Sequence, residues 1–395
     1  MSILASPCKS PKCRLQQLPS ELLIRIFLFG QNPAFVSTCK SIYTISRSPL
    51  IRAQFILRRY GPLAALSERC LTSLPIARQL PVVDYLLKLR ADPRADADYL
   101  LWQSIREQNV NLTILLVDAI QPDTRTLQQY LNGAASHGSI SMVDLLVARY
   151  GASIDHGDGT VMMLACAENR VELVRHLLTR YHCDPHAFRD QYLRRACLSG
   201  HEALVELLLP GADVHAFNDA ALQNAVHKNH LGIAYQLLAQ GASANVNRGA
   251  CVILAVQQHH VPILRLLLDH GADPRCQQDS PLQLSCRMGL LDVAQVLVEF
   301  ASERLAMINT LKGMPLYEAF RHGHADVVDF LLSGGADPSL PLAQQGLHEA
   351  ILHNHVACVA QLQRAHTELP LPRPLAQYKA SASGPMFQLI QHWAS

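Results

Sequence analysis

The sequence lacks three features that would each mark a class of protein: a long apolar run, a concentrated positive patch and a paired-cysteine framework. Its most apolar short run, residues 22–29, is interrupted by Arg25, whereas a membrane-spanning helix needs about 20 consecutive apolar residues. The N-terminus has no basic segment followed by an apolar one, which is the pattern of a secretory signal. We therefore expect neither a membrane span nor secretion.

Charge and cysteine content exclude further classes. Lys and Arg total 34 and Asp and Glu total 32, a formal net charge of +2, and no long basic run offers the positive face that nucleic acids require. The 11 cysteines are odd in number and scattered along 395 residues, unlike a small disulfide-bonded scaffold. A cytoplasmic or nuclear protein with no nucleic-acid or membrane partner is expected.

What the sequence does contain is an internal repeat. Hydrophobic residues make up 49% of the chain, enough for a continuous core. Short apolar helix patterns end in Gly-Ala-Asp or Gly-Ala-Ser, or in His-Cys-Asp in one copy, within residues 142–153, 173–185, 204–214, 233–244, 263–274 and 327–338. Such self-similarity indicates stacked supersecondary units.

A second marker fixes the register of the repeat. A small residue recurs at intervals of 29 to 34 positions, and a turn residue that is often His follows it five positions later. The pairs are Ala134/Ser139, Ala165/Arg170, Ala196/His201, Ala225/His230, Ala255/His260, Ser285/Leu290, Ala319/His324 and Ala350/His355. This spacing predicts two short helices and a turn in each unit.

These units resemble ankyrin repeats. Ser280-Pro281-Leu282, Met314-Pro315-Leu316 and residues 346–350 stand where that family has Thr-Pro-Leu-His-x-Ala, and residues 322–324 match its Gly-His turn. The resemblance covers residues 134–363 well and extends more weakly back to residue 82. It implies an all-α solenoid of roughly nine or ten units over residues 70–366, which binds other proteins.

Elementary physics supports the same architecture. Helices of about 8 to 10 residues are too short to be stable alone in water, so each apolar stripe must be covered by a neighbouring unit. Gly211, Gly241, Gly271 and Gly335 follow second helices, where a left-handed residue ends a helix. Residues 301–313 are an insertion that we expect to form a longer loop.

The N-terminal region carries a separate pattern. Residues 1–17 mix Ser, Pro and Lys and are expected to be a disordered leader. Apolar residues then recur at helical spacing from Leu18 to Phe27. Further helices are expected at residues 33–46 and 49–60. At the other end, residues 367–395 are expected to form a linker and a C-terminal capping half-repeat.

Residues 18–55 resemble an F-box, whose pattern begins Leu-Pro-x-Glu-Leu-Leu-x-x-Ile-Phe. The specified positions are met by Leu18, Pro19, Glu21, Leu22, Leu23, Ile26 and Phe27. The link between the first two helices is shorter than in the family, and the terminal Trp is missing. The resemblance implies that Leu18, Pro19, Leu22, Leu23, Ile26 and Phe27 contact a Skp1-type adaptor of a ubiquitin ligase by burying a helix in a groove. The alternative is that residues 18–60 form a helical cap on the first repeat.

No residue pattern predicts a catalytic, cofactor or metal site. Five of the 19 histidines, namely His201, His230, His260, His324 and His355, share one turn position and are expected to hydrogen-bond neighbouring backbone. Cys8 and Cys13 have no second ligand pair at zinc spacing. Cys166, Cys197 and Cys286 each follow the small marker residue and are expected to be buried and inert.

The sequence therefore predicts a non-enzymatic substrate receptor of an SCF-type ubiquitin ligase. Its N-terminal helices would hold the adaptor, and its ankyrin surface would hold an unidentified client protein. The competing hypothesis is an ankyrin scaffold that is independent of any ligase.

Overall fold

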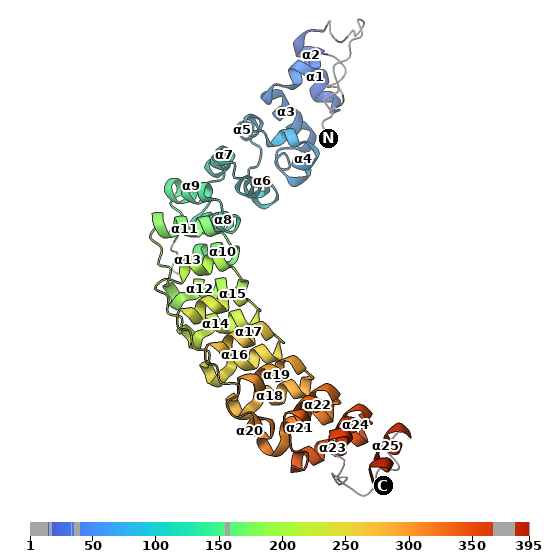
Figure 1. Cartoon of the computed structure of the whole chain (residues 1–395). Coiled ribbons are helices and arrows are strands. Elements are labelled where there is room, and N and C mark those ends of the chain that lie inside the picture. Colours follow the sequence, from blue (N-terminus) through green and yellow to red (C-terminus); the bar gives the residue numbers. More distant parts are fainter. Residues whose placement is uncertain are drawn as a thin grey trace. The chain divides into compact units, whose positions relative to one another are not determined.

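The structure is a computed structural model that describes residues 15, 18–32, 34, 40–154, 159–365 and 384–394. These residues form helices, turns and loops but no strand, so the predicted all-α solenoid of helix-turn-helix units is confirmed (Figure 1). The chain divides into two compact units, Met1–Cys183 and Asp184–Ser395. The boundary falls inside the repeat array.

The first unit contains the N-terminal helices and the first helical hairpins. Its elements are α1 (Ser20–Gly30), α2 (Lys40–Ser46), α3 (Pro49–Tyr60), α4 (Glu68–Ser73), η3 (Pro75–Arg78), α5 (Leu80–Lys88), α6 (Ala95–Arg106), α7 (Val110–Ile120), α8 (Thr124–His137), α9 (Ile140–Tyr150), α10 (Thr160–Ala167) and α11 (Val171–Arg180). From α6 to α11, each even-numbered helix forms a hairpin with the next odd-numbered one.

The second unit continues the array of hairpins, with one short helix inserted among them and one helix after the last hairpin. Its helices are α12 (Ala187–Ser199), α13 (Glu202–Leu208), α14 (Ala216–His227), α15 (Leu231–Ala239), α16 (Val246–Gln257), α17 (Val261–Asp269), α18 (Cys276–Met288), α19 (Leu291–Phe300), α20 (Arg304–Ile308), α21 (Thr310–His322), α22 (Ala325–Ser333), α23 (Pro341–Leu352), α24 (Val356–Ala365) and α25 (Gly384–Ala394). First helices stack on first helices and second on second within the unit, as in α12 on α14 and α13 on α15.

The turn inside each hairpin explains the small-residue marker. The carbonyl of Ala225 accepts the N–H of His230 at 2.9 Å, and Ala255 accepts from His260 at 2.8 Å. The residue before each histidine has positive φ, 60° at Asn229 and 56° at His259. This is the Schellman arrangement that ends a helix. The small marker side chain is fully buried, as in Ala225 and Ala255, so neighbouring helices can approach closely.

The loop between successive hairpins is unusually short. In the loop into α14, Phe217, Asn218 and Asp219 have φ of 55°, 58° and 53°, which is a left-handed turn. The same turn recurs at residues 96–98, 188–190, 247–249, 277–279 and 311–313. The regular part of each first helix begins after this turn, so Pro281 and Pro315 fall in a first helical turn, where no N–H is needed. Compact loops account for repeat spacings close to 30 residues.

The insertion at residues 301–313 is better ordered than the sequence predicted. Instead of a long loop it forms the short helix α20, whose Met307 and Ile308 are buried. Asn309 then ties it to the next hairpin: its side chain donates to the Gly335 carbonyl and accepts the N–H of Asp337 at 2.7 Å. The insertion therefore extends the core of the stack.

The terminal regions match the predicted helices where the structure describes them. The predicted third helix at residues 49–60 coincides with α3, and α2 covers the last part of the predicted second helix. The rest of that prediction, at residues 35–39, lies outside the described residues, as do nearly all of the predicted leader and the linker at 367–383. In the C-terminal helix α25, Met386 and Ile390 are fully buried.

Candidate protein-binding surfaces

The N-terminal helices form a module with a core of its own. Pro19 lies just before α1 and its carbonyl accepts the N–H groups of Leu22 and Leu23, which starts the helix. Phe27 stacks on Phe55 of α3 with 4.9 Å between ring centroids. The buried cluster comprises Leu23, Phe27, Leu28, Ile42 and Phe55. Burial of these side chains, about 1.5–3 kcal/mol for each large one, holds α1, α2 and α3 together.

The six residues predicted to contact an adaptor separate into two groups. Leu23 and Phe27 are only 2% and 4% exposed, so in this conformation they act by positioning α1 and do not offer a contact surface. The other four reach the surface to different extents: Pro19 is exposed, Leu22 is 44% exposed, and Leu18 and Ile26 are half-buried. Of the six, only Leu18, Pro19, Leu22 and Ile26 therefore have side chains at the surface of the module.

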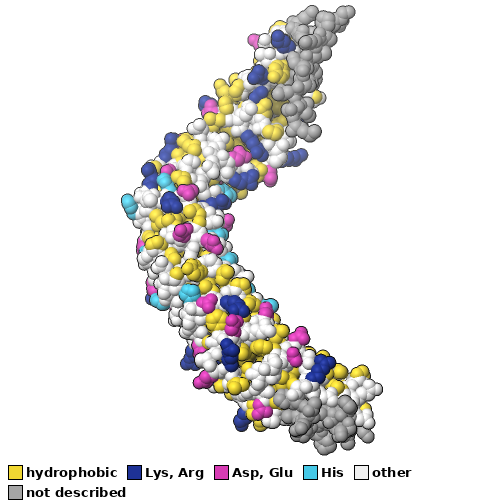
Figure 2. Space-filling view, in the orientation of Figure 1, with side chains coloured by type: hydrophobic (Ala, Val, Ile, Leu, Met, Phe, Trp, Pro, Cys, Tyr) yellow, Lys and Arg dark blue, Asp and Glu magenta, His cyan; other side chains and the backbone are white. Residues whose placement is uncertain are grey.

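Sequence reasoning missed a neighbouring aromatic residue on the same helix. Phe29 is 71% exposed, and the guanidinium of Arg58 on α3 lies 4.3 Å from its ring centroid. Hydrophobic side chains gather at the surface over these N-terminal helices (Figure 2). The apolar run that begins at Leu22 continues past Phe27 to Phe29. This continuation was the sequence signal that could have identified Phe29 as a further candidate.

A cavity of about 480 Å³ lies between the N-terminal helices and η3. Phe27, Phe55 and Leu74 give it apolar walls, and Arg47 and Arg52 lie at its edge. Arg52 donates to the Ser46 carbonyl at 2.7 Å and to Gln79 at 2.8 Å. Burial, followed by the nearby charge of Arg47, lowers the pKa of Arg52. The walls of the cavity therefore come from both the N-terminal helices and the η3 segment.

The loops between hairpins form the second candidate surface. The turn into α14 exposes Phe217 and buries Asp219, which is 4% exposed. Asp219 accepts the N–H of Ser243 at 2.9 Å and a hydrogen bond from His215 at 3.0 Å. Asp190 does the same one repeat earlier, accepting the N–H of Asp213 at 3.0 Å. Each buried carboxylate thus links its loop to the next repeat.

Two later loops make the same link with different chemistry. Where glycine replaces the buried aspartate, at Gly249 and Gly313, an asparagine four positions earlier makes the bond. Asn245 accepts the N–H of Asp273 and donates to the Gly271 carbonyl, both at 2.8 Å. A β-carbon at Gly249 would lie 2.5 Å from Cys276 Sγ, so only glycine fits. In every case the bonded N–H belongs to the third residue of Gly-Ala-Asp or Gly-Ala-Ser.

Aromatic side chains are exposed at two of these loops. Phe188 and Phe217 occupy the first position of the left-handed turn in successive repeats and are 44% and 53% exposed. The guanidinium of Arg194 lies 4.2 Å from the Phe217 ring centroid, and Arg194 also donates to the Phe188 carbonyl at 3.4 Å. Aromatic and arginine side chains together are typical of protein interfaces.

The turn histidines are structural, as predicted, where their hydrogen bonds are described. His260, His324 and His355 each bond a backbone carbonyl of the preceding repeat, on Val226, Arg287 and Phe320, at 2.9 to 3.0 Å. Arg170, which replaces histidine in one repeat, donates to the Ser136 carbonyl at 2.8 Å. These side chains fasten successive hairpins together.

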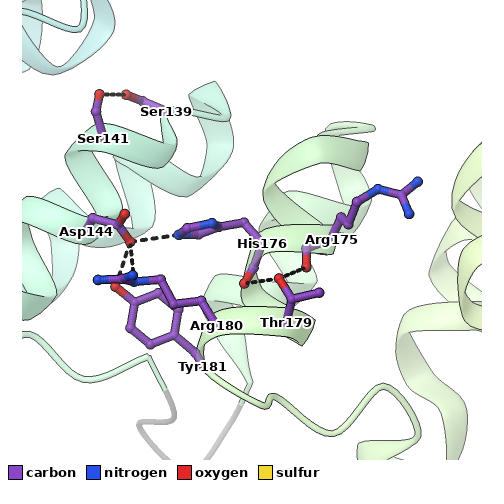
Figure 3. Close-up of polar contacts among 8 residues, drawn as sticks. All are labelled: Ser139, Ser141, Asp144, Arg175, His176, Thr179, Arg180 and Tyr181. Atoms are coloured by element: carbon purple, nitrogen blue, oxygen red, sulfur yellow. Dashed lines mark hydrogen bonds and ion pairs between the residues drawn. The ribbon is translucent and has the colours of Figure 1, made fainter.

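A polar cluster surrounds Asp144 on α9 (Figure 3). Its carboxylate accepts hydrogen bonds from His176 at 2.8 Å and Tyr181 at 2.7 Å, and the Arg180 guanidinium lies 3.6 Å away. Burial alone would raise the pKa of Asp144, but the hydrogen bonds from His176 and Tyr181 and the charges of His176 and Arg180 outweigh it and lower the pKa. Burial and the bond to Asp144 raise the pKa of Tyr181.

The marker cysteines are buried as predicted. Cys166, Cys197 and Cys286 are fully buried, and burial raises the pKa of each thiol to about 12. A thiol at this pKa supplies almost no nucleophilic thiolate at neutral pH. Cys8 and Cys13 lie outside the described residues.

Neither a metal cluster nor a membrane-spanning helix is found in the part of the chain that the structure describes. No group of three or more His, Cys, Asp or Glu side chains could hold an ion there. None of the described helices combines the length and apolar character needed to cross a bilayer.

Comparison with known proteins identifies the repeat. The model of the family described as ankyrin repeats (3 copies) matches residues 131–218, 193–278, 222–304 and 253–341, which together span more than half of the chain. One similar solved structure is the human ASB11 ankyrin repeat domain, 22% identical, covering 55% of this chain and 96% of that one with a TM-score of 0.39. No curated protein matches the sequence.

Proposed function

Since the chain belongs to the ankyrin-repeat family, we propose that it is the substrate receptor of an SCF-type ubiquitin ligase. Ankyrin repeats bind proteins, and the array is the surface that would hold the client. The N-terminal module would bind a Skp1-type adaptor. The chain itself would catalyse nothing and would act by bringing the client close to the catalytic subunits, in the cytoplasm or the nucleus.

The observation that carries the proposal is the exposed apolar face of α1. Leu22 is 44% exposed although the adjacent Leu23 is buried, and Phe29 is more exposed still at 71%. A soluble protein usually keeps contiguous apolar side chains of one helix away from water unless a partner covers them. A helix presented in this way suits burial in a groove of another protein.

The packing of the module also bears on the alternative function, a ligase-independent scaffold with a helical cap. α3 packs against α5 and η3, so the module does cover the start of the repeats. The covering is made by α3, whereas α1 packs on α2 and α3. Capping by α3 and adaptor binding by α1 are compatible, and the exposed side of α1 is what favours the receptor.

A pull-down with purified Skp1-type adaptor tests the proposal. The native chain should retain the adaptor, and Leu22→Asp should lose it, because a charge at the centre of an apolar contact is costly to bury. Leu63→Asp is the matched control: Leu63 is 76% exposed and lies in the loop after α3. Circular dichroism should show the same helix content and melting temperature for all three proteins.

Two outcomes would contradict the receptor. If the folded native chain does not retain the adaptor, the scaffold is the function that remains. If Leu22→Asp and Leu63→Asp retain it equally well, the contact does not use the face of α1. A Phe27→Asp variant is unsuitable for this test, because Phe27 belongs to the core of the module and its loss would disturb the fold.

A further inference from the structure

The second unit carries an asymmetric distribution of charge on its first helices. Within α12, α14, α16 and α18 every Asp is buried and no Glu occurs: Asp190, Asp219 and Asp279 are 3%, 4% and 2% exposed. The cations of the same helices reach the surface, half-buried in one case and exposed in the others. They are Arg189, Arg194, Arg195, Arg248 and Arg287, and the exposed Lys228 directly follows α14. These helices therefore present positive charge without accessible acidic side chains of their own.

The buried acids do not neutralise these cations, because they are engaged within the loops. Asp219 is bonded to Ser243 and His215, and Asp279 to Arg275 at 2.9 Å. The second helices show the opposite tendency: α13 carries Glu202 and Glu206 and no Lys or Arg. Among α13, α15, α17 and α19, only α17 carries a cation, Arg265, and it pairs with Glu299 on α19 at 3.2 Å. The remaining helix cations of these four hairpins lie on the first helices.

The exposed aromatic residues lie at one end of this cationic face. At the first position of the left-handed turn, the repeats that follow Phe188 and Phe217 carry Asn247 and Gln277. The turn therefore does not need an aromatic side chain, and a bulky residue at positive φ is unfavourable. The Phe188 ring contacts Tyr192 edge to face, with 6.4 Å between centroids, and the Phe217 ring lies against Arg194. Both rings still leave much of their surface exposed and suit contact with a partner.

We propose that the first-helix face of α12, α14, α16 and α18 binds an acidic segment of a client protein that also carries apolar side chains. The apolar side chains would pack on Phe188 and Phe217, and the carboxylates would pair with Arg189, Arg195 and the cations further along. The inference rests on the client-binding role proposed above for the repeats. It adds the chemical class of the client and the residues that recognise it.

Fluorescence anisotropy with labelled peptides tests this surface. The probe is a fluorescein-labelled peptide of Glu, Asp, Pro and Leu, compared with a matched peptide in which Lys and Arg replace the acids. The native full-length chain should bind the acidic probe and not the basic one, and affinity should fall as salt rises. Arg195→Glu should weaken binding at least about fivefold, whereas Arg364→Glu on α24, with the same change of charge, should leave it within about twofold.

A second pair of substitutions isolates the aromatic contribution. Phe188→Asn with Phe217→Asn should not lower the melting temperature, since Asn tolerates positive φ and occupies the equivalent position at Asn247. It should weaken binding of the Leu-containing probe about tenfold and bring its affinity close to that of a probe in which Ser replaces Leu. A structural role for the two rings would lower the melting temperature instead.

Several results would overturn the proposal. One is that the folded chain does not bind the acidic probe, and another is that Arg195→Glu and Arg364→Glu lose affinity for it equally. A third is that the chain binds oligouridylate as tightly as the acidic probe, which would indicate a nucleic-acid surface. Adaptor retention measured on the same preparations separates the two proposals. A chain that retains the adaptor but not the probe refutes the acidic client alone, and the reverse result refutes the ligase alone.

Discussion

At the residue scale, side-chain bonds to backbone hold the array together at two kinds of position, the turn within a hairpin and the loop between hairpins. Turn histidines such as His260 reach a carbonyl of the preceding repeat, and loop residues such as Asp219 or Asn245 reach an N–H of the following one. Left-handed residues that are not glycine cost about 1–2 kcal/mol each, and these bonds offset part of that cost. The loops can therefore be short and still well defined.

Asp219 provides the first test of this arrangement. Asp219→Ala should lower the free energy of unfolding by about 1–3 kcal/mol, because the buried N–H of Ser243 loses its acceptor. Asp219→Asn keeps an acceptor oxygen and should cost clearly less. Urea unfolding followed by circular dichroism measures both, and equal losses in the two variants would show that the bond to Ser243 is unimportant.

Asp144 gives the stability a dependence on pH. Its pKa is lowered in the folded chain, so its contribution is fully present above the unfolded value of about 3.9 and is lost as pH falls through the folded pKa. Between pH about 6 and 3, the native chain should lose more stability than Asp144→Asn. Thermal melts across this range check the difference, and parallel curves would contradict it.

The buried cysteines supply a third test. Cys166, Cys197, Cys251, Cys286 and Cys358 are fully buried, and burial raises the pKa of each to about 12. They should not react with iodoacetamide in the folded chain at neutral pH and should react after unfolding in urea. Peptide mass spectrometry identifies the labelled positions, and rapid labelling of Cys286 in the native chain would contradict its burial.

At the scale of elements, α1 has two faces with different tasks. One face, with Leu23 and Phe27, builds the core of the module, and the other exposes Leu22. The spacing of apolar residues predicted the helix but could not show which face is buried. Apolar residues cover more of the α1 surface than the core of the module contacts. Only the packing of α2 and α3 determines which of them reach the surface.

This division predicts different costs for two truncations in α1. Phe27→Ala should lower the stability of the module by about 3–5 kcal/mol through the lost contact with Phe55 and the cavity left behind. Leu22→Ala should change it by about 0.5 kcal/mol or less, as at most surface positions. Hydrogen exchange of α1 and α3 amides reports on the module specifically, and equal exchange in both variants would contradict the assignment of faces.

The sequence predicted those features of the repeats that depend on residues close together in the chain, and missed those that depend on contacts between repeats. The pairing of Ala225 with His230 reports a turn closed within five residues, so its spacing was visible in the sequence. The bond from Ser243 to Asp219 joins two repeats, and at a later loop Asn245 makes the equivalent bond in place of an aspartate. No fixed residue type therefore marks this bond in the sequence. Exposure of Phe188 and Phe217 likewise follows from loop geometry that composition does not reveal.

At the scale of the whole molecule, the two proposed binding surfaces belong to different units of one chain. The module at the N-terminus offers an apolar helix face, and the first helices of the second unit offer cations and aromatic rings. In a repeat array each unit contacts mainly its neighbours, so substitutions in one surface should leave the other intact. Leu22→Asp should therefore bind the acidic probe with native affinity, as measured by anisotropy, and a loss there would show that the surfaces are not independent.

The proposal that one chain joins an adaptor to a client can be tested by analytical ultracentrifugation with fluorescence detection. The native chain is mixed with the labelled acidic peptide and then with an excess of Skp1-type adaptor. We predict that the peptide sediments with the chain and moves to a larger species when the adaptor is added, and that Leu22→Asp prevents only this second shift. Release of the peptide by the adaptor, or no change on adding it to the folded native chain, would contradict the claim.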